Sequence, residues 1–275
     1  MEAGDSTLLT IPVVCNFLIF LFKTGYSSSY LNSARSALSF FCLDHLDIGN
    51  NLYIQKLFKF FYRKRPLRAK YLTFWPVSSV INFLKEWHPF DNLSLKMLTL
   101  KTLALVALSC SDRGQTLHLM NIRDMEYEGE HLNFIINSRV KNTRKYLKPK
   151  VVKCICTDNP HLNVASYVSH YIDVTKRYRG PNDIQLFISW KTHKPVSKQT
   201  ISRWLTSVLK LSGINTDVYQ GHSFRGAGLS KAFAKGASLP SILAAGDWKQ
   251  VQTFKSYYCA PSYTSSVGQL ILSED

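Results

Sequence analysis

Acidic residues are scarce in this 275-residue chain, which has 18 Asp and Glu against 34 Lys and Arg, a net charge of +16. Such an imbalance favours a polyanionic partner, either nucleic acid or an anionic membrane surface, and says nothing about sequence specificity. Hydrophobic residues at 45% and aromatic residues at 13% exclude general disorder. The length suits two modest domains or one large one, each able to bury a core.

Long apolar runs are also lacking. The most apolar stretch, residues 8–22, is only 15 residues long, contains Pro12 and Asn16, and follows an acidic start at Glu2 and Asp5. A membrane span needs about 20 apolar residues, and a secretory signal needs a positively charged start. We therefore expect a buried helix, no membrane partner and an intracellular location, which is the nucleus if the nucleic-acid partner is the DNA of a eukaryotic cell.

Metal-ligand spacing is missing as well. Six cysteines are scattered along the chain, and Cys154 and Cys156 form the only close pair. Because no second pair of soft ligands follows at zinc-site spacing, we expect reduced, mostly buried thiols and no metal or other cofactor. The sequence also contains no internal repeat and no low-complexity tract.

The first 60 residues have a helical pattern. Apolar residues recur at helical spacing over 13–21 and again over 30–41, and residues 51–61 form a third short amphipathic segment. We therefore expect a small helical bundle in this region.

A strongly basic run at residues 63–70, which contains Pro66, is the best linker candidate. It predicts a helical N-terminal domain over 1–66 and a second domain over 67–275. The run is either a solvated charged loop or a contact to the DNA backbone, and the sequence favours neither.

The second domain is expected to be mainly α with a small antiparallel β-sheet. Ser197 and Ser223 are expected N-caps, and Gly213 and Gly236 are expected helix stops. The expected helices span 77–87, 93–109, 166–178, 197–211 and 223–234, and the expected strands span 125–128, 132–136 and 151–156.

The last fifth of the chain holds a chemically informative set: His222, Arg225, Trp248 and the adjacent Tyr257 and Tyr258. Each alone has an ordinary reading, as a structural histidine, a core indole or packed phenols. Together they supply what reversible phosphodiester cleavage without a metal requires. These requirements are a nucleophile, cations for the transition state and a proton donor for the leaving oxygen.

Two earlier segments add cations. Arg113 follows an apolar helix, and its ordinary reading is a cap or a salt bridge with Asp112. Lys141 follows the second expected strand, where seven basic residues between 139 and 153 suggest phosphate contacts rather than a solvent-facing hairpin.

The ordered set Arg113, Lys141, His222-x-x-Arg225, Trp248 and Tyr258 resembles the catalytic domain of tyrosine recombinases, the phage-integrase superfamily. The resemblance is greatest to the versions carried by eukaryotic mobile elements of the Crypton and DIRS-like kind. It spans essentially the whole chain, including N-terminal helices that look like a shortened core-binding domain. Each motif alone is unspecific, whereas their full order is specific.

The resemblance implies a transposable-element recombinase that acts on double-stranded DNA, as a tetramer on paired sites. Arg113 and Arg225 would clamp the phosphate, Lys141 would protonate the leaving 5′ oxygen, and His222 would handle the proton of the tyrosine. Trp248 would support the phosphate. The DNA-contact candidates are Arg63, Lys64, Arg65, Arg68, Lys70, Arg139, Arg144, Lys145, Lys198 and Arg203.

The sequence departs from the family pattern in two places. Many relatives carry an acidic residue three positions after the first arginine, where this chain has Thr116. The nucleophile is Tyr257 by the spacing of classical members and Tyr258 by that of the eukaryotic-element versions, and we favour Tyr258. A catalytically inactive, DNA-binding descendant is the alternative function.

Overall fold

The computed structural model of the chain describes residues 9–41, 46–66, 73–138, 140, 149–248, 250–252 and 254. The chain divides into two compact units, Met1–Ala69 and Lys70–Asp275. That the first unit is a core-binding domain remains a prediction. Within the described residues, the helices are all too short or too polar to cross a lipid bilayer.

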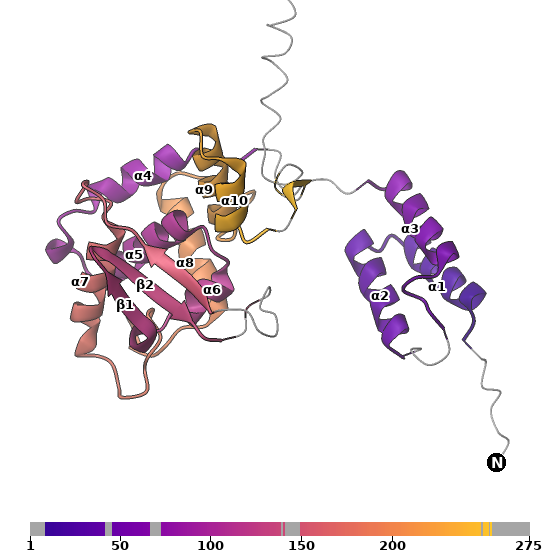
Figure 1. The fold of residues 1–275 in the computed structure, drawn as a ribbon, viewed down its shortest axis with the longest axis horizontal. Coiled ribbons are helices and arrows are strands. Elements are labelled where there is room, and N and C mark those ends of the chain that lie inside the picture. The colour runs from indigo at the N-terminus through magenta and orange to yellow at the C-terminus, as the bar shows by residue number, and fades with distance from the viewer. Residues whose placement is uncertain are drawn as a thin grey trace, which may run out of the picture. The chain divides into compact units, whose positions relative to one another are not determined.

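The first unit is a three-helix bundle of α1 (Ile11–Lys23), α2 (Ser28–Phe41) and α3 (Leu52–Lys64) (Figure 1). Pro12 lies in the first turn of α1, where its missing N–H leaves no helical hydrogen bond unmade. At the start of α3, the Asn51 side chain caps the N–H groups of Tyr53 and Ile54.

The expected buried first helix is buried on one side only. Val14, Leu18 and Leu21 face the core of the bundle, whereas Phe17 and Phe20 are 43% and 59% exposed. A helix of a three-helix bundle can bury only one stripe, so an almost entirely apolar sequence leaves its other face in solvent.

The expected linker begins later than residue 63, because α3 continues through Arg63 and Lys64. Arg65 then donates hydrogen bonds to the backbone carbonyls of Tyr26 at 3.1 Å and Phe22 at 2.5 Å. Its guanidinium also lies 3.6 Å from the ring centroid of Phe22. Arg65 therefore ties the end of α3 to the end of α1, while Arg63 and Lys64 remain exposed.

The second unit is built around α5 (Leu95–Cys110), from which every residue between Leu98 and Ala107 is buried. A helix that is buried on all sides requires neighbours on all sides. Those neighbours include α7 (Val164–Lys176), α8 (Lys198–Leu211) and α9 (Ser223–Ala234) (Figure 1). Outside this group, α4 (Val77–Glu86) packs against α9.

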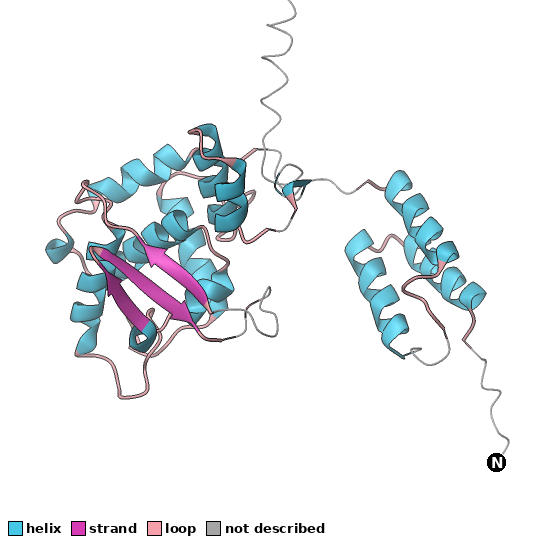
Figure 2. Ribbon diagram, viewed as in Figure 1, coloured by secondary structure: helices cyan, strands magenta, loops and turns pink. Residues whose placement is uncertain are grey.

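A three-stranded antiparallel sheet covers one side of these helices (Figure 2). Its strands are β1 (Met125–Glu128), β2 (His131–Ile136) and β3 (Lys150–Cys154), and Leu132 pairs with Tyr127 and Cys154. Alternate residues of β2 are buried, as the period of a half-covered strand requires. The predicted mainly α fold with a small antiparallel sheet is confirmed.

Three of the four predicted helix signals are confirmed. Ser197 caps α8 by accepting the Thr200 N–H, and Gly213 and Gly236 have φ of +79° and +91°, which favours glycine at a helix end. The prediction for Ser223 is wrong, because His222 occupies the N-cap position and the Ser223 hydroxyl accepts from the Trp75 indole at 2.8 Å.

Four short helices were not expected from the sequence: the 3₁₀ turns Phe90–Asn92 and Ile122–Asp124, α6 (Gly114–Leu119) and α10 (Leu239–Ala245). They are too short to show a helical period in the sequence, so tertiary packing determines whether these helices form. Both α6 and α10 lie next to the cavity described below.

Candidate phosphate-binding site

A cavity of about 910 Å³ opens in the second unit, between α6, α8, the start of α9 and the turn after α10. Arg113, His222, Arg225 and Trp248 all line it, although they come from three distant parts of the sequence. The structure therefore brings four of the predicted catalytic residues to one place.

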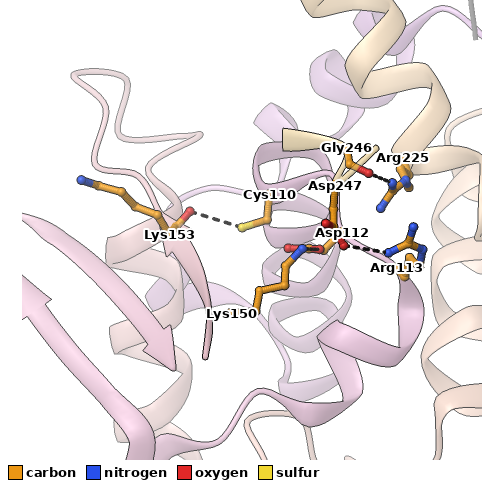
Figure 3. Close-up of polar contacts among 8 residues, drawn as sticks. All are labelled: Cys110, Asp112, Arg113, Lys150, Lys153, Arg225, Gly246 and Asp247. Atoms are coloured by element: carbon orange, nitrogen blue, oxygen red, sulfur yellow. Dashed lines mark hydrogen bonds and ion pairs between the residues drawn. The ribbon is translucent and has the colours of Figure 1, made fainter. Parts of the chain in front are cut away.

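Arg113 occupies the N-cap position of α6, just after the left-handed turn at Ser111 that ends α5. One of its terminal nitrogens lies 3.3 Å from a carboxylate oxygen of Asp247 (Figure 3). The two side chains are 28% and 36% exposed, so this ion pair lies at the open side of the cavity. The sequence suggested Asp112 as the partner of Arg113, and the structure pairs Arg113 with Asp247.

Asp112 instead lines the cavity with a buried carboxylate. Its side chain is 5% exposed and lies 2.5 Å from the ammonium of Lys150, at the start of β3 (Figure 3). Burial raises the pKa of Asp112, while Lys150 and the nearby Arg225 and Arg113 oppose that rise. The Cys110 thiol donates to the Lys153 carbonyl at 3.3 Å, which holds β3 against the end of α5.

Arg225 is buried in the first turn of α9 and donates a hydrogen bond to the backbone carbonyl of Gly246 (Figure 3). Its guanidinium carbon lies 4.8 Å from the ring centroid of Trp248, a cation–π contact. His222, one helical turn earlier, is exposed and lines the cavity. The indole of Trp248 also packs on the small core of Leu229, Ile242 and Phe254, as the ordinary reading of a core indole predicted.

Two glycines allow this close packing. A Cβ on Gly246 would lie 2.2 Å from Cε3 of the Trp248 ring, and a Cβ on Gly221 would lie 2.5 Å from the Ser202 carbonyl oxygen of α8. The Gly221 N–H also donates to the Thr206 hydroxyl at 2.9 Å. Glycine before His222 therefore lets the start of α9 approach α8.

Of the remaining predicted site residues, Lys198 and Arg203 are described by the structure. Lys198 lines the cavity from the first turn of α8, whereas Arg203 is exposed further along α8 and donates to the Thr200 hydroxyl at 3.1 Å. The others lie outside the described residues: Arg68, Lys70, Arg139, Lys141, Arg144, Lys145, Tyr257 and Tyr258. In the part of the chain that the structure describes, His, Cys, Asp and Glu form no group that could hold a metal ion.

Three residues near the arginines had no role in the sequence-based site: Gly246, Asp247 and Lys150. Gly246 and Asp247 directly precede Trp248, so the motif that identified the indole contained them. Lys150 was one of seven basic residues in its segment. Its pairing with Asp112 depends on the register of β3 and could not be seen in the sequence.

The fold, with its buried central helix, small sheet and arginine-lined cavity, is that of a tyrosine recombinase catalytic domain. Residues 71–264 match the family model described as the Phage integrase family. This is more than half of the chain, so the chain belongs to that family. No curated protein sequence matches the chain.

Solved structures with this fold include three recombination proteins. The Tn1549 transposon integrase in complex with transposon right end DNA is 12% identical, with a TM-score of 0.62 over 98% of this chain and 87% of that one. A lambda integrase dimer bound to a COC′ core site is 14% identical, with a TM-score of 0.57 over 95% and 83%. XerA recombinase is 14% identical, with a TM-score of 0.54 over 100% and 86%. At these identities the similarity shows the fold.

Proposed function

We propose that this protein is a site-specific DNA recombinase or integrase that cuts and rejoins DNA strands through a covalent 3′-phosphotyrosyl intermediate, without a metal. The observation that supports this function best is the convergence of Arg113, His222, Arg225 and Trp248 on one cavity. Two guanidinium groups beside a histidine and an indole suit a phosphodiester whose charge grows in the transition state.

In the proposed reaction, a tyrosine oxygen attacks the scissile phosphorus and the bond to the 5′ oxygen breaks. Arg113 and Arg225 bind the non-bridging oxygens, and His222 takes the proton of the tyrosine. Lys141 gives a proton to the leaving 5′ oxygen. The reverse attack by a 5′ hydroxyl reseals a strand and releases the tyrosine, so the two steps need no external energy source.

Tyr258 is the proposed nucleophile and Tyr257 the alternative. An ordinary tyrosine has a pKa of about 10, so attack at neutral pH needs cations that stabilise the phenolate. Because Arg225 contacts both Gly246 and Trp248, the segment that leads to the two tyrosines starts beside such cations.

Double-stranded DNA is the proposed partner, by analogy with the DNA-bound lambda and Tn1549 integrases. A tetramer on paired sites is the proposed active assembly, by analogy with a lambda integrase tetramer bound to a Holliday junction. The net charge of +16 and the exposed Arg63, Lys64 and Lys198 agree with a DNA ligand. We further propose an origin in a eukaryotic mobile element of the Crypton or DIRS-like kind, and a nuclear location.

The test is covalent capture on nicked suicide duplexes of randomised sequence, because the target site is unknown. We expect an adduct that survives denaturant, that carries DNA at its 3′ end, and that disappears in Tyr258→Phe. Tyr257→Phe is the matched control. If Tyr257→Phe alone abolishes the adduct, the nucleophile assignment reverses. An adduct that survives the double substitution would contradict the proposed chemistry.

A catalytically inactive DNA-binding descendant is the second candidate. One observation favours it: the position where many relatives carry an acidic residue is the buried Thr116. This function predicts duplex binding that weakens with salt and no adduct with any member of the pool. It also predicts that substituting Arg113 leaves duplex binding unchanged.

A further inference from the structure

The turn Gly246–Trp248 contacts both arginines through three different groups. The Gly246 carbonyl accepts from Arg225, the Trp248 ring lies against the same guanidinium, and the Asp247 carboxylate pairs with Arg113 (Figure 3). A carboxylate on a guanidinium uses the same planar donors that a phosphate oxygen uses. The side chain of Asp247 thus occupies a place on Arg113 that the proposed substrate needs.

We propose that Asp247 is a binding-determining residue of this cavity: its carboxylate holds Arg113 until a DNA phosphodiester replaces it. This inference rests on the proposed function for its ligand, DNA. Arg113 then exchanges one anion for another, and Asp247 sets how tightly the cavity binds phosphate.

The two ion pairs of the cavity differ in their distance and in their exposure to solvent, and such an exchange requires one pair that is exposed. Lys150 and Asp112 are 2.5 Å apart, and both side chains are largely buried. Arg113 and Asp247 are 3.3 Å apart and open to solvent. An exposed pair of this kind contributes at most about 1 kcal/mol, whereas a phosphate bound by two guanidinium forks gains more. The outer pair is therefore the one that a phosphate can displace.

The backbone of the turn is also consistent with a carboxylate that is held in place. Asp247 has φ of +47°, in the left-handed region that Asp tolerates better than most residues other than glycine. This conformation follows the end of α10, and the side chain points to Arg113 (Figure 3). Loss of the ion pair removes one of the contacts that hold the turn at the start of the segment leading to Tyr257 and Tyr258.

The main test measures duplex affinity in protein that carries Tyr257→Phe and Tyr258→Phe, so that cleavage does not interfere. We expect Asp247→Asn to bind about fivefold more tightly than the parent, which corresponds to an exposed pair of about 1 kcal/mol. Glu128→Gln is the matched control, because it makes the same charge change at an exposed carboxylate paired with Lys153, outside the cavity. The control accounts for the general effect of one less negative charge.

A double-substitution cycle assigns the gain to Arg113. In protein that also carries Arg113→Ala, Asp247→Asn should bind no more tightly than Glu128→Gln, because the cation that the two anions share is gone. A gain that persists without Arg113 would overturn the inference, as would an Asp247→Asn protein that binds no more tightly than the Glu128→Gln control. Weaker binding would show that Asp247 positions Arg113 and does not compete for it.

A second measurement uses inorganic phosphate as the probe and needs neither DNA nor chemistry. Phosphate that binds the folded state raises the midpoint of thermal unfolding. We expect a larger rise for Asp247→Asn than for the parent, and none for Arg113→Ala. If phosphate stabilises neither protein, the inference is wrong. If the Asp247→Asn gain appears while no DNA adduct forms, the inference holds and the proposed enzymatic function fails.

Discussion

Helix α5 places charged groups in two regions of the second unit, one inside the packed core and one beside the cavity. In its middle, Lys101 is completely buried, and its ammonium donates to the Trp87 carbonyl at 2.5 Å and lies 4.2 Å from the ring centroid of Tyr167. Just beyond its end, Asp112 is buried against Lys150, and Arg113 faces an open cavity.

The difference is in what surrounds each charge. Burial lowers the pKa of Lys101 to about 8, and the contacts of its ammonium among the described residues are a carbonyl and a ring. Burial raises the pKa of Asp112, but three cations oppose that effect. The buried charge of Lys101 thus contacts a carbonyl and a ring within the packed core. The charges of Asp112 and Arg113 lie beside groups of opposite charge at the cavity. Four substitutions test this comparison.

Arg113→Ala should have the largest effect. We expect the rate of adduct formation to fall about 10²- to 10³-fold, because one of two cations on the transition-state charge is lost. Single-turnover cleavage measures this rate. Arg177→Ala, which removes an exposed arginine outside the cavity, should cleave at the parental rate. Equal losses in both variants would mean that general charge, rather than the cavity, drives cleavage.

Lys101→Met should change the pH dependence of stability and leave cleavage intact. The pKa of Lys101 is lower in the folded than in the unfolded protein, so the contribution of Lys101 to the free energy of unfolding should rise by about 3 kcal/mol between pH 8 and 10.5. Denaturant titrations should show this rise as the change with pH in the difference between the parent and Lys101→Met, because buried groups such as Tyr167 titrate alike in both proteins. His88 and Tyr167 also face Lys101, and both remain in the variant.

Lys176→Met, at an exposed position of α7, is the matched control and should keep the rise. Neutral methionine also avoids the desolvation of an ammonium, and the Trp87 carbonyl keeps the Tyr167 hydroxyl as a donor at 3.1 Å. We therefore expect Lys101→Met to be the more stable protein at pH 7. A loss of cleavage in this variant would remove the distinction between the two regions.

Gly246→Ala tests the packing of the cavity. The backbone of Gly246 has φ of −79°, which alanine adopts freely, so the effect comes only from the new methyl against the Trp248 ring. We expect a loss of about 1–3 kcal/mol in unfolding free energy and slower cleavage. Gly114→Ala is the control. Gly114 lines the same cavity, but a Cβ there would have its nearest neighbour, Cγ of Lys198, at 4.0 Å, so thermal unfolding should show little change.

Asp112→Asn should have the smallest effect on stability and a distinct effect on rate. It removes the desolvation of a buried carboxylate but leaves Lys150 without its partner, so we expect unfolding free energy within about 1 kcal/mol of the parent at pH 7. Because the folded pKa of Asp112 is raised, the parent should gain stability over the variant as the pH falls toward 4.

The rate of adduct formation should fall about tenfold in Asp112→Asn, since the anion that faces both arginines is lost. Lys150→Met should produce a similar loss if the pair acts as a unit. An unchanged rate in both variants would mean that the buried pair, like Lys101, contributes to packing and does not contribute to cleavage.

Local patterns predicted most of the helices and strands of this protein correctly. Ser223–Ala234 and Met125–Glu128 have the predicted bounds, because the hydrophobic period and nearby glycines are signals that act within a few residues of one another. The exposed side of α1 was missed, since an almost wholly apolar helix does not reveal which stripe its neighbours cover. The fold class was predictable because strand and helix periods differ.

The candidate site divides in the same way. The sequence by itself determined that Arg113, His222, Arg225 and Trp248 are present in an order typical of one enzyme family. The physical reason is that the type of each side chain limits the chemistry that it can perform. Only the tertiary structure decided that Arg113 pairs with Asp247, that Asp112 pairs with Lys150, and that Gly246 must lack a side chain. These contacts join residues up to 134 positions apart, and such distances are fixed by packing rather than by local sequence.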